Sequence, residues 1–439
     1  MESILLYHCR ALLMDEENTL LDPAYVVVEG ERIAAVSSTR PQGPFAQEID
    51  CGGNVLMPGL VNAHTHIPMT LMRGYAGGCD LHTWLNDWIF PAEAKLDDRA
   101  VRAGADLALA ELIAGGVTTI ADMYMHTPAI AQAVLAAGIS ANLSCGGGYF
   151  GAPGDFGPDT CPDCDHQRQL TEEFHGAGNG QILVDASIHG EYTSNVPLWQ
   201  WMADYAQRKG LGMHVHVSET QSEHEGSLTR WGLTPFRILD RYGVWDTRAI
   251  AAHCVWTTED DWAGMAEKGV ACVHNPVSNL KLGSGVAWIP AMKAAGVPIA
   301  LGTDGVSSNN NQDMFEEMKF AAVLHNGVTR DPLALLPQDV LAMATREGAK
   351  ALGRKTGRIA PGYVADLILV DFTRPHLTPC HSVMDNLVYA AHGSDVVMNM
   401  ARGKIIYKDG TFLTLDLEKI QAEVKSYALP RLFGDGKTW

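Results

Sequence analysis

Eight short apolar runs follow one another through the middle of the chain, and each run ends on polar residues. The runs are residues 57–66, 116–124, 138–146, 181–191, 210–219, 249–255, 269–276 and 297–305. The segments between them carry apolar residues at helical spacing, and a glycine introduces several of the runs, as glycine does just past a helix end. Short apolar strands that alternate with helices predict a parallel sheet covered by helices. Eight such units in about 300 residues predict an α/β fold, a (β/α)8 barrel of the TIM type.

Both ends of the chain are rich in strand-like segments. Residues 1–57 contain two apolar stretches around a Glu-Gly turn, and residues 358–415 contain further stretches with turn residues between them. Neither end is large enough to be stable alone. We therefore expect a small β-sandwich domain made from residues 1–57 and 358–415, with the barrel of residues 58–357 inserted. Residues 416–439 are expected to form a C-terminal helix, capped by Asp416, and a tail.

Composition argues against several classes of partner. The chain has 32 basic and 51 acidic residues, a formal net charge of −19, which disfavours nucleic acid and anionic membranes as partners. No stretch approaches the apolar length of a membrane span, and the N-terminus does not have the pattern of a secretory signal. Nine scattered cysteines fit a cytoplasmic location, and Cys161 and Cys164 are interpreted as two free thiols. The oligomeric state stays open, with a homo-oligomer as one alternative.

The polar residues at the strand ends include a ligand set for a metal ion. His64 and His66 lie two residues apart at the end of the first run, and side chains at that spacing point to the same side of a strand. His216 ends the fifth run, and Asp304 ends the eighth, which neighbours the first in a closed barrel. Three nitrogens and one carboxylate, with a position left for water, form a catalytic zinc-type site. His214 lies farther from the strand end and is interpreted as a residue of the barrel interior.

Two further residues stand where they could take part in chemistry. Glu219 follows His216 by three residues and could deliver protons to a ring nitrogen or a leaving group, with a solvated loop glutamate as the alternative. His253 ends the sixth run and could hydrogen-bond to a metal-bound water, with a buried structural histidine as the alternative.

These residues, in this order, resemble the amidohydrolase superfamily. The resemblance covers nearly the whole chain and rests on the motifs PGLVNAHTH, HVHVSETQSE, AHCV, NPVSNLKLGSG and LGTDGVSSNN. Within the superfamily the chain is most similar to the methylthioadenosine/S-adenosylhomocysteine deaminases and their aromatic-aminohydrolase relatives, which hold one metal ion. Binuclear members add a carbamylated lysine from the fourth strand. Here the only lysines between His66 and His216 are Lys95 and Lys209, and neither is at a strand end, which also favours one metal ion.

The resemblance implies a zinc-dependent deaminase that converts an adenosine-type nucleoside to the inosine analogue and ammonia. His64, His66, His216 and Asp304 would bind one zinc ion per subunit, with iron or manganese as alternatives. Asp304 would also accept a proton from the bound water, and the resulting hydroxide would attack the amino-bearing ring carbon.

The resemblance also assigns roles around the substrate. Glu219 would protonate the purine ring nitrogen, and His253 would orient the hydroxide. Glu93 corresponds to a glutamate that holds the ribose diol, and His189 to a histidine near the sugar. Their alternatives are an acid at a helix start and a core histidine. Trp84, in the loop after the first strand, is expected to pack against the base.

The chain departs from the family pattern in two places. The loop of residues 141–167 contains no Arg or Lys, whereas members that accept S-adenosylhomocysteine use arginines there to hold the amino-acid tail. We therefore expect methylthioadenosine or adenosine to be handled better than S-adenosylhomocysteine, unless an arginine such as Arg73 or Arg168, or one from a neighbouring subunit, reaches the tail. Trp288 stands where relatives usually have proline and is expected to narrow the pocket.

Other functions remain open at this point. One is an aminohydrolase or dechlorinase that acts on another aromatic ring, such as guanine, a pterin or a triazine. A second, from a different class, is a non-catalytic relative that kept the fold for assembly, although none of the expected ligands is missing. The zinc deaminases with an H-x-E and a downstream P-C-x-x-C motif are excluded, because the Cys161 and Cys164 pair lies upstream of the only H-x-E sequence at His189 and lacks the leading proline.

Overall fold

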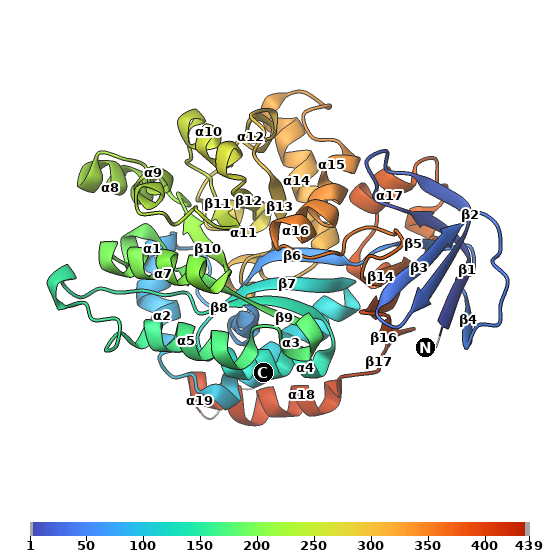
Figure 1. The fold of residues 1–439 in the computed structure, drawn as a ribbon, viewed down its shortest axis with the longest axis horizontal. Coiled ribbons are helices and arrows are strands. Elements are labelled where there is room, and N and C mark those ends of the chain that lie inside the picture. Colours follow the sequence, from blue (N-terminus) through green and yellow to red (C-terminus); the bar gives the residue numbers. More distant parts are fainter. Residues whose placement is uncertain (1–2, 435–439) are drawn as a thin grey trace.

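The computed structural model describes residues 3–434 and contains two β-sheets. Residues 1–2 and 435–439, assigned from the sequence to the β-domain and to the C-terminal tail, lie outside the described residues. One sheet is parallel, has eight strands and is surrounded by helices, and the other is a mixed sheet beside it (Figure 1). The predicted α/β fold, a (β/α)8 barrel with a small β-domain, is confirmed, and the domain expected as a β-sandwich is built on one continuous mixed sheet. The boundaries proposed between the domains stay predictions.

The strands of the barrel are β6 (Leu60–Thr65), β7 (Val117–Met123), β8 (Ser140–Ser144), β9 (Ile182–Ile188), β10 (Gly212–Val217), β11 (Ala249–His253), β12 (Ala271–His274) and β13 (Ile299–Leu301). The α-helices around them are α1 (Leu81–Thr83), α2 (Phe90–Glu93), α3 (Asp98–Ala114), α4 (Thr127–Ala137), α5 (Pro162–Phe174), α6 (Ala177–Gly180), α7 (Val196–Lys209), α8 (Gln221–Trp231), α9 (Pro235–Arg241), α10 (Glu259–Lys268), α11 (Pro276–Lys281), α12 (Ile289–Ala294), α13 (Val306–Asn309), α14 (Met314–Thr329), α15 (Pro337–Met343) and α16 (Arg346–Ala351). Short 3-10 and π segments are η1 (Ile67–Met72), η2 (Trp84–Ile89), η3 (Pro153–Asp155) and η4 (Glu191–Thr193).

The eight strands pair in chain order from β6 to β13, and each apolar run of the sequence contains one of them. The ring closes between β13 and β6, because the Asp304 N–H donates to the His64 carbonyl at 2.9 Å and Thr65 pairs with Asp304 in a parallel bridge. All residues of the eight strands are buried except Leu183. Burial on both faces explains why the strands read as nearly continuous apolar runs and do not alternate.

The helices begin and end at residues suited to those positions. The helix α7 is an example, because the Asn195 side chain accepts a hydrogen bond from the Leu198 N–H at its start. The same helix ends at Lys209, and the next residue, Gly210, has a φ of +67°, in the left-handed region that glycine adopts at least cost. Among the helices of residues 3–434, none has both the length and the apolar character needed to cross a bilayer.

The mixed sheet joins the two ends of the chain. Its strands are β1 (Ser3–Leu12), β2 (Leu20–Glu29), β3 (Arg32–Ser37), β4 (Gln47–Asp50), β5 (Val55–Pro58), β14 (Leu367–Val370), β15 (Val396–Ala401), β16 (Lys404–Lys408) and β17 (Thr411–Phe412). The pairing of β5 with β14 sets Pro58 beside Leu367, so the N-terminal and C-terminal parts form one sheet. Leu6, Val26 and Met398 are buried together in a core that is separate from that of the barrel. The remaining elements of this region are η5 (Pro375–Leu377), α17 (Val383–Tyr389) and η6 (Gly393–Asp395).

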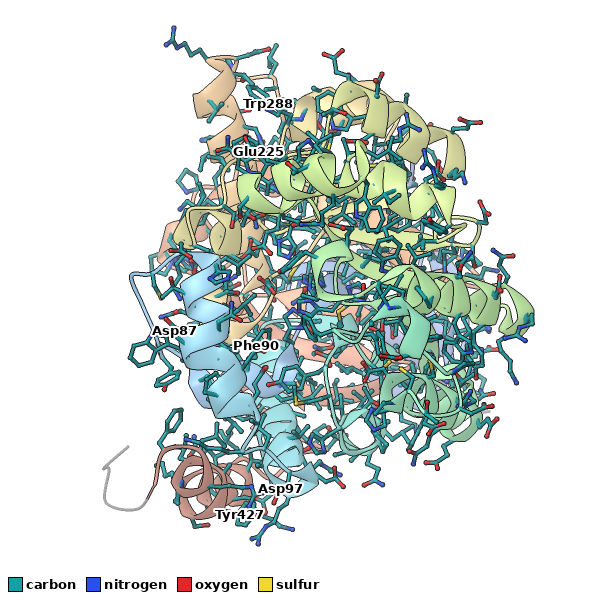
Figure 2. The ribbon with its side chains drawn as sticks, turned by 90° about the vertical axis from the view of Figure 1, so that its left-hand side faces the viewer. Asp87, Phe90, Asp97, Glu225, Trp288 and Tyr427 are labelled. Carbon is teal, nitrogen blue, oxygen red and sulfur yellow. The ribbon has the colours of Figure 1, made fainter. Side chains whose placement is uncertain are left out.

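The chain returns to the barrel after β17. It forms α18 (Leu417–Glu423), the π segment η7 (Val424–Ala428) and α19 (Leu429–Phe433), and Asp416 accepts a hydrogen bond from the Lys419 N–H at the start of α18. The Tyr427 hydroxyl donates to Asp97, the residue that caps α3, at 2.5 Å (Figure 2). The guanidinium of Arg99 lies 3.8 Å from the centre of the Tyr427 ring. The C-terminal helices therefore pack against the outside of the barrel at α3.

Arg354 connects the segment after α16 to the amino ends of two barrel strands. Its guanidinium donates to the Asn142 side chain at 2.7 Å and to the carbonyls of Gly180 and Gln181 at 3.2 and 3.1 Å, and also to the Ala141 carbonyl. Burial of this group lowers the pKa of Arg354 to about 10. Because these acceptors lie at the amino ends of β8 and β9, we interpret Arg354 as a stabilising residue and not as part of a site.

We predict that Arg354→Met destabilises the protein by about 2–4 kcal/mol, because it leaves several acceptors of the barrel floor without their charged donor. The urea midpoint of unfolding, followed by circular dichroism, measures this. Lys350→Met, at an exposed position of α16, is the matched control and should change the midpoint little. Equal midpoints for the two variants would contradict the prediction.

Candidate active site

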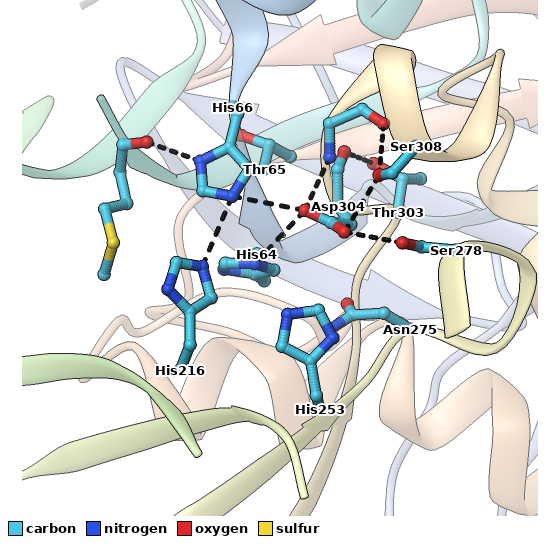
Figure 3. A network of polar contacts seen from close by, with 12 residues as sticks. His64, Thr65, His66, His216, His253, Asn275, Ser278, Thr303, Asp304 and Ser308 are labelled. Atoms are coloured by element: carbon cyan, nitrogen blue, oxygen red, sulfur yellow. Dashed lines mark hydrogen bonds and ion pairs between the residues drawn. The ribbon is translucent and has the colours of Figure 1, made fainter. Parts of the chain in front are cut away.

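Four side chains converge at the carboxyl ends of the barrel strands (Figure 3). His66 Nε2 lies 3.2 Å from Asp304 Oδ1 and 3.3 Å from His216 Nε2, and His64 Nε2 lies 3.4 Å from Asp304 Oδ1. The donor atoms of His64, His66 and Asp304 all lie within 4.8 Å of one another, and so do those of His64, His216 and His253. Donor atoms this close, in a buried position, form a candidate site for a divalent metal ion.

The outer nitrogens of the three histidines are held by the barrel wall. His66 Nδ1 contacts the Met123 carbonyl at 2.5 Å, and His216 Nδ1 contacts the His189 carbonyl at 2.6 Å. A carbonyl can only accept, so each Nδ1 carries the proton and each Nε2 offers its lone pair to the centre. His64 Nδ1 lies 2.8 Å from His214 Nε2, and His64 Nε2 is buried without a hydrogen-bond partner. This unpartnered nitrogen fits a metal ion at the centre.

Burial changes the proton affinity of these groups. It lowers the pKa of His64 to about 3 and holds the pKa of His216 well below its usual value. Burial acts in the same direction on His66, but its hydrogen bond to Asp304 and the charge of Asp304 raise the pKa of His66 to about 9. Burial would raise the pKa of Asp304, yet its contacts with His64 and His66 keep it well below the usual range. Positive charge is therefore favoured beside Asp304, where a divalent cation would compete with a proton.

The Asp304 carboxylate is fixed on both oxygens. Oδ2 accepts hydrogen bonds from the hydroxyls of Ser278 at 2.6 Å and Ser308 at 2.9 Å, and Oδ1 accepts from the Gly305 N–H at 2.7 Å. Asp304 has a φ of +62° and His253 a φ of +75°, a region that residues other than glycine rarely adopt. His253 is the last residue of β11 and Asp304 follows the end of β13 by three residues, so the unusual backbone lies at the candidate site.

Glu219 and His253 lie beside the metal-ligand cluster. Glu219 Oε2 is 3.7 Å from His253 Nε2, and Glu219 Oε1 accepts from the Ser284 hydroxyl at 3.3 Å. Burial and the nearby charge of Asp304 raise the pKa of Glu219 to about 8, so this carboxyl can hold a proton near neutral pH. His253 Nδ1 lies 2.9 Å from the amide nitrogen of Asn279, which donates to it, so His253 Nε2–H can donate toward the centre.

A cavity of about 400 Å³ opens above the cluster. Glu93 and Trp84, which are 5% and 4% exposed, both line it. The Tyr124 hydroxyl donates to Glu93 at 2.6 Å, and burial raises the pKa of Glu93 to about 7 against the effect of that hydrogen bond. His189 also lines the cavity, with its Nδ1 3.1 Å from the Thr193 hydroxyl. A cavity of this size with a few converging polar groups is typical of a small-molecule site.

The structure therefore brings the candidate residues of the sequence to one cavity, and their roles stay predictions. The lining includes His66, His216, Asp304, Glu219, His253, Glu93, His189 and Trp84. His64 lies beneath them and is fully buried.

Trp288 does not line the cavity: it is the residue before α12 and is 52% exposed (Figure 2), so the expectation that it narrows the pocket is wrong. Cys161 and Cys164 are free thiols, and both are buried.

Several supporting residues were missed from the sequence. His214, interpreted only as an interior residue, lies against His64 on the side away from the centre. Ser278, Asn279 and Ser284 hold Asp304, His253 and Glu219, and all three lie in the NPVSNLKLGSG motif, to which no individual roles were assigned. The signal was present in that motif, but spacing alone does not show which polar side chain of a loop turns inward.

The chain is similar to known proteins in both sequence and structure. The curated 5-methylthioadenosine/S-adenosylhomocysteine deaminase of Moorella thermoacetica is 44% identical over 383 residues, which cover 86% of this chain and 87% of that protein. The 5'-deoxyadenosine deaminase of Methanosarcina mazei is 40% identical over 98% of both chains. A crystal structure of an adenosine deaminase from Xanthomonas campestris with bound zinc superposes with a TM-score of 0.91 at 32% identity, over 96% of this chain and 97% of that one.

A family model described as "Amidohydrolase family" matches residues 55–406. This span holds the whole barrel and the strands that join it to the mixed sheet. The family model matches most of the chain, and relatives of about 40% identity align along nearly its full length. The chain therefore belongs to the amidohydrolase family.

Proposed function

We propose that the protein is a hydrolytic deaminase of an adenosine-type nucleoside, which it converts to the inosine analogue and ammonia. The observation that carries the proposal is a single cavity that holds the His/Asp cluster, a protonatable Glu219 and a separate buried Glu93. Purine deamination needs an activated water, a proton donor for the ring and a group that binds the sugar. The His/Asp cluster, Glu219 and Glu93 would supply these in that order. The names of the relatives described above support the same reaction.

His64, His66, His216 and Asp304 would hold one divalent metal ion, and we propose zinc because three imidazoles and one carboxylate are a common zinc ligand set. Iron or manganese are the alternatives. When bound, such an ion polarises a water molecule and makes it a nucleophile at neutral pH.

The residues of the chain would move the protons. Asp304 is a carboxylate with a lowered pKa, and it would accept the proton that the attacking water loses. Glu219 has a raised pKa, and it would give a proton to the ring nitrogen next to the amino-bearing carbon. His253 would donate from Nε2 to the oxygen that adds to the ring, since Asn279 occupies its other nitrogen. The carbon–nitrogen bond of the adduct would then break as the amino group takes the proton held by Asp304 and leaves as ammonia. The hydroxyl of the adduct would become the carbonyl and return its proton to Glu219, so that Asp304 ends ionised and Glu219 ends protonated, as they began.

The sugar and the base would be held by the other side of the cavity. Glu93 has one oxygen hydrogen-bonded to Tyr124, and it would accept hydrogen bonds from the ribose hydroxyls. His189 would stand near the sugar, and Trp84 would pack against the base. The direct test is a screen for ammonia release from adenosine, methylthioadenosine, guanine, pterins and triazines. Turnover of only a compound that lacks ribose would overturn the proposal.

We predict close to one equivalent of metal per chain in the purified protein, measured by plasma mass spectrometry. His66→Ala should reduce that content, because it removes one of four ligands. Chelator-treated protein should lose turnover and recover it with one equivalent of zinc. Two equivalents in fully active protein would contradict a mononuclear site.

We predict that Glu219→Gln keeps the metal and lowers kcat by roughly 10²–10⁴-fold, because the amide matches the carboxyl in size but cannot transfer its proton. Steady-state ammonia release and metal analysis of the same preparation measure this. Glu225→Gln, at an exposed position of α8, is the matched control and should turn over normally. Loss of metal in Glu219→Gln would instead make Glu219 a ligand.

We predict that adenosine is preferred over free adenine and that Glu93→Ala removes most of this preference. Hydrogen bonds to a charged group contribute roughly 1.5–3 kcal/mol, which corresponds to about 10- to 150-fold in kcat/KM. Adenine serves as the internal control, because it lacks the ribose and should respond little to the substitution. An unchanged ratio of the two kcat/KM values would show that Glu93 does not hold the sugar.

A further inference from the structure

The charged side chains that line the cavity are acidic. Glu93, Asp163, Glu219 and Asp304 line it, and within residues 3–434 no lysine or arginine is among the lining residues. Such an arrangement disfavours any anionic group of a ligand, because a buried negative charge without a cationic partner is costly.

The two arginines that the sequence left open are held elsewhere. Arg73 pairs with Glu111 and also donates to the Asn310 carbonyl. Arg168 pairs with Asp165 at 2.5 Å and donates to the Pro158 carbonyl at 2.8 Å. Neither guanidinium lines the cavity. Each would have to give up a charged partner before it could reach a ligand there.

Asp163 enters the cavity lining from a different element than the reacting residues do. The metal-ligand cluster, Glu219 and His253 come from β6, β10, β11 and the segment after β13, whereas Asp163 comes from the first turn of α5. Gly148, in the loop after β8, contacts Asp163 and lines the cavity with it, and Gly146 of the same loop and Thr193 after β9 are also lining residues. In the proposed function, the amino group of the nucleoside lies at the metal-ligand cluster and its ribose hydroxyls lie at Glu93. The 5′ group then remains to be placed, and we assign to it the part of the cavity lined by the segments after β8 and β9.

The Asp163 carboxylate is positioned by the loop after β8. Oδ2 accepts a hydrogen bond from the Gly148 N–H at 2.8 Å, and the side chain is 30% exposed. A positively chargeable group beside it is His166, whose Nδ1 lies 3.8 Å from Oδ1 and whose side chain is 61% exposed. Burial raises the pKa of Asp163, and the Gly148 hydrogen bond acts against this because it stabilises the charged form.

We propose that Asp163 is a specificity-determining residue that selects the 5′ group of the substrate by charge, favouring cationic and neutral groups over anionic ones. The inference rests on the proposed function and adds a substrate class to it. A carboxylate at this place repels an anionic 5′ group and attracts an ammonium, and partial exposure to water reduces both effects.

The test uses three 5′-thioadenosines that differ only at sulfur, which carries a methyl, a 2-aminoethyl or a carboxymethyl group. In the unmodified enzyme, kcat/KM for ammonia release should be at least about tenfold lower for the carboxymethyl compound than for the methyl compound. Asp163→Asn should raise the carboxymethyl-to-methyl ratio by about tenfold and lower the aminoethyl-to-methyl ratio. Each ratio compares kcat/KM values measured on one preparation, so a general loss of active protein does not change it.

Two further variants separate charge from structure. Asp163→Glu keeps the charge and should keep the order of the three substrates. Asp155→Asn removes one charge from an exposed position of the same loop that does not line the cavity, and it should leave the ratios unchanged.

The outcomes distinguish the two proposals. If the methyl compound is deaminated but Asp163→Asn leaves the carboxymethyl-to-methyl ratio of kcat/KM as it is in the unmodified enzyme, the proposed function stands and the role of Asp163 is overturned. Efficient turnover of the carboxymethyl compound by the unmodified enzyme overturns it as well. If adenosine and all three thioadenosines are inert in the metal-loaded protein, the proposed function itself fails, and this inference fails with it.

Discussion

The hydrogen bond from the Asp304 amide to the His64 carbonyl joins the last strand of the barrel to the first, and the candidate site depends on that closure. It brings Asp304 close to His64 and His66, although about 240 residues separate Asp304 from the two histidines in the chain. The strand β10 stands four places from β6 in a ring of eight, so His216 approaches from the opposite wall. The four side chains therefore meet over the axis of the barrel, at the base of the cavity.

The surrounding polar groups keep this cluster rigid. The carbonyls of Met123 and His189 fix the tautomers of His66 and His216, and two serine hydroxyls fix Asp304. Pre-set ligands and proton carriers spare the reaction the cost of ordering them at each turnover. The left-handed backbone of His253 and Asp304 is a local cost that the packed strands around them offset.

The charged side chains of the cavity lining are carboxyl groups, in keeping with the net negative charge of the chain. Carboxyl groups serve there in different protonation states, since burial raises the pKa of Glu219 to about 8 and the histidine contacts lower that of Asp304. Two carboxyl groups with separated proton affinities can act as donor and acceptor in one reaction. The same excess of negative charge, extended by Asp163, would limit which substrates can enter.

The sequence by itself determined the barrel, the composite sheet and the order of the candidate ligands. Near-continuous apolar runs arise only when strands are buried on both faces, and polar residues at the ends of the first, fifth and eighth runs must then share one edge of the sheet. The tertiary structure decided which neighbours hold those residues in place. Strand parity could not separate His214 from His216, because the two face the same way and differ only in depth. The direction of long side chains could not be predicted from the sequence either. Arg73 pairs with Glu111, Arg168 pairs with Asp165, and Trp288 is exposed. A pattern along the chain records spacing and burial, whereas the direction of a flexible or surface side chain depends on partners that only folding brings near.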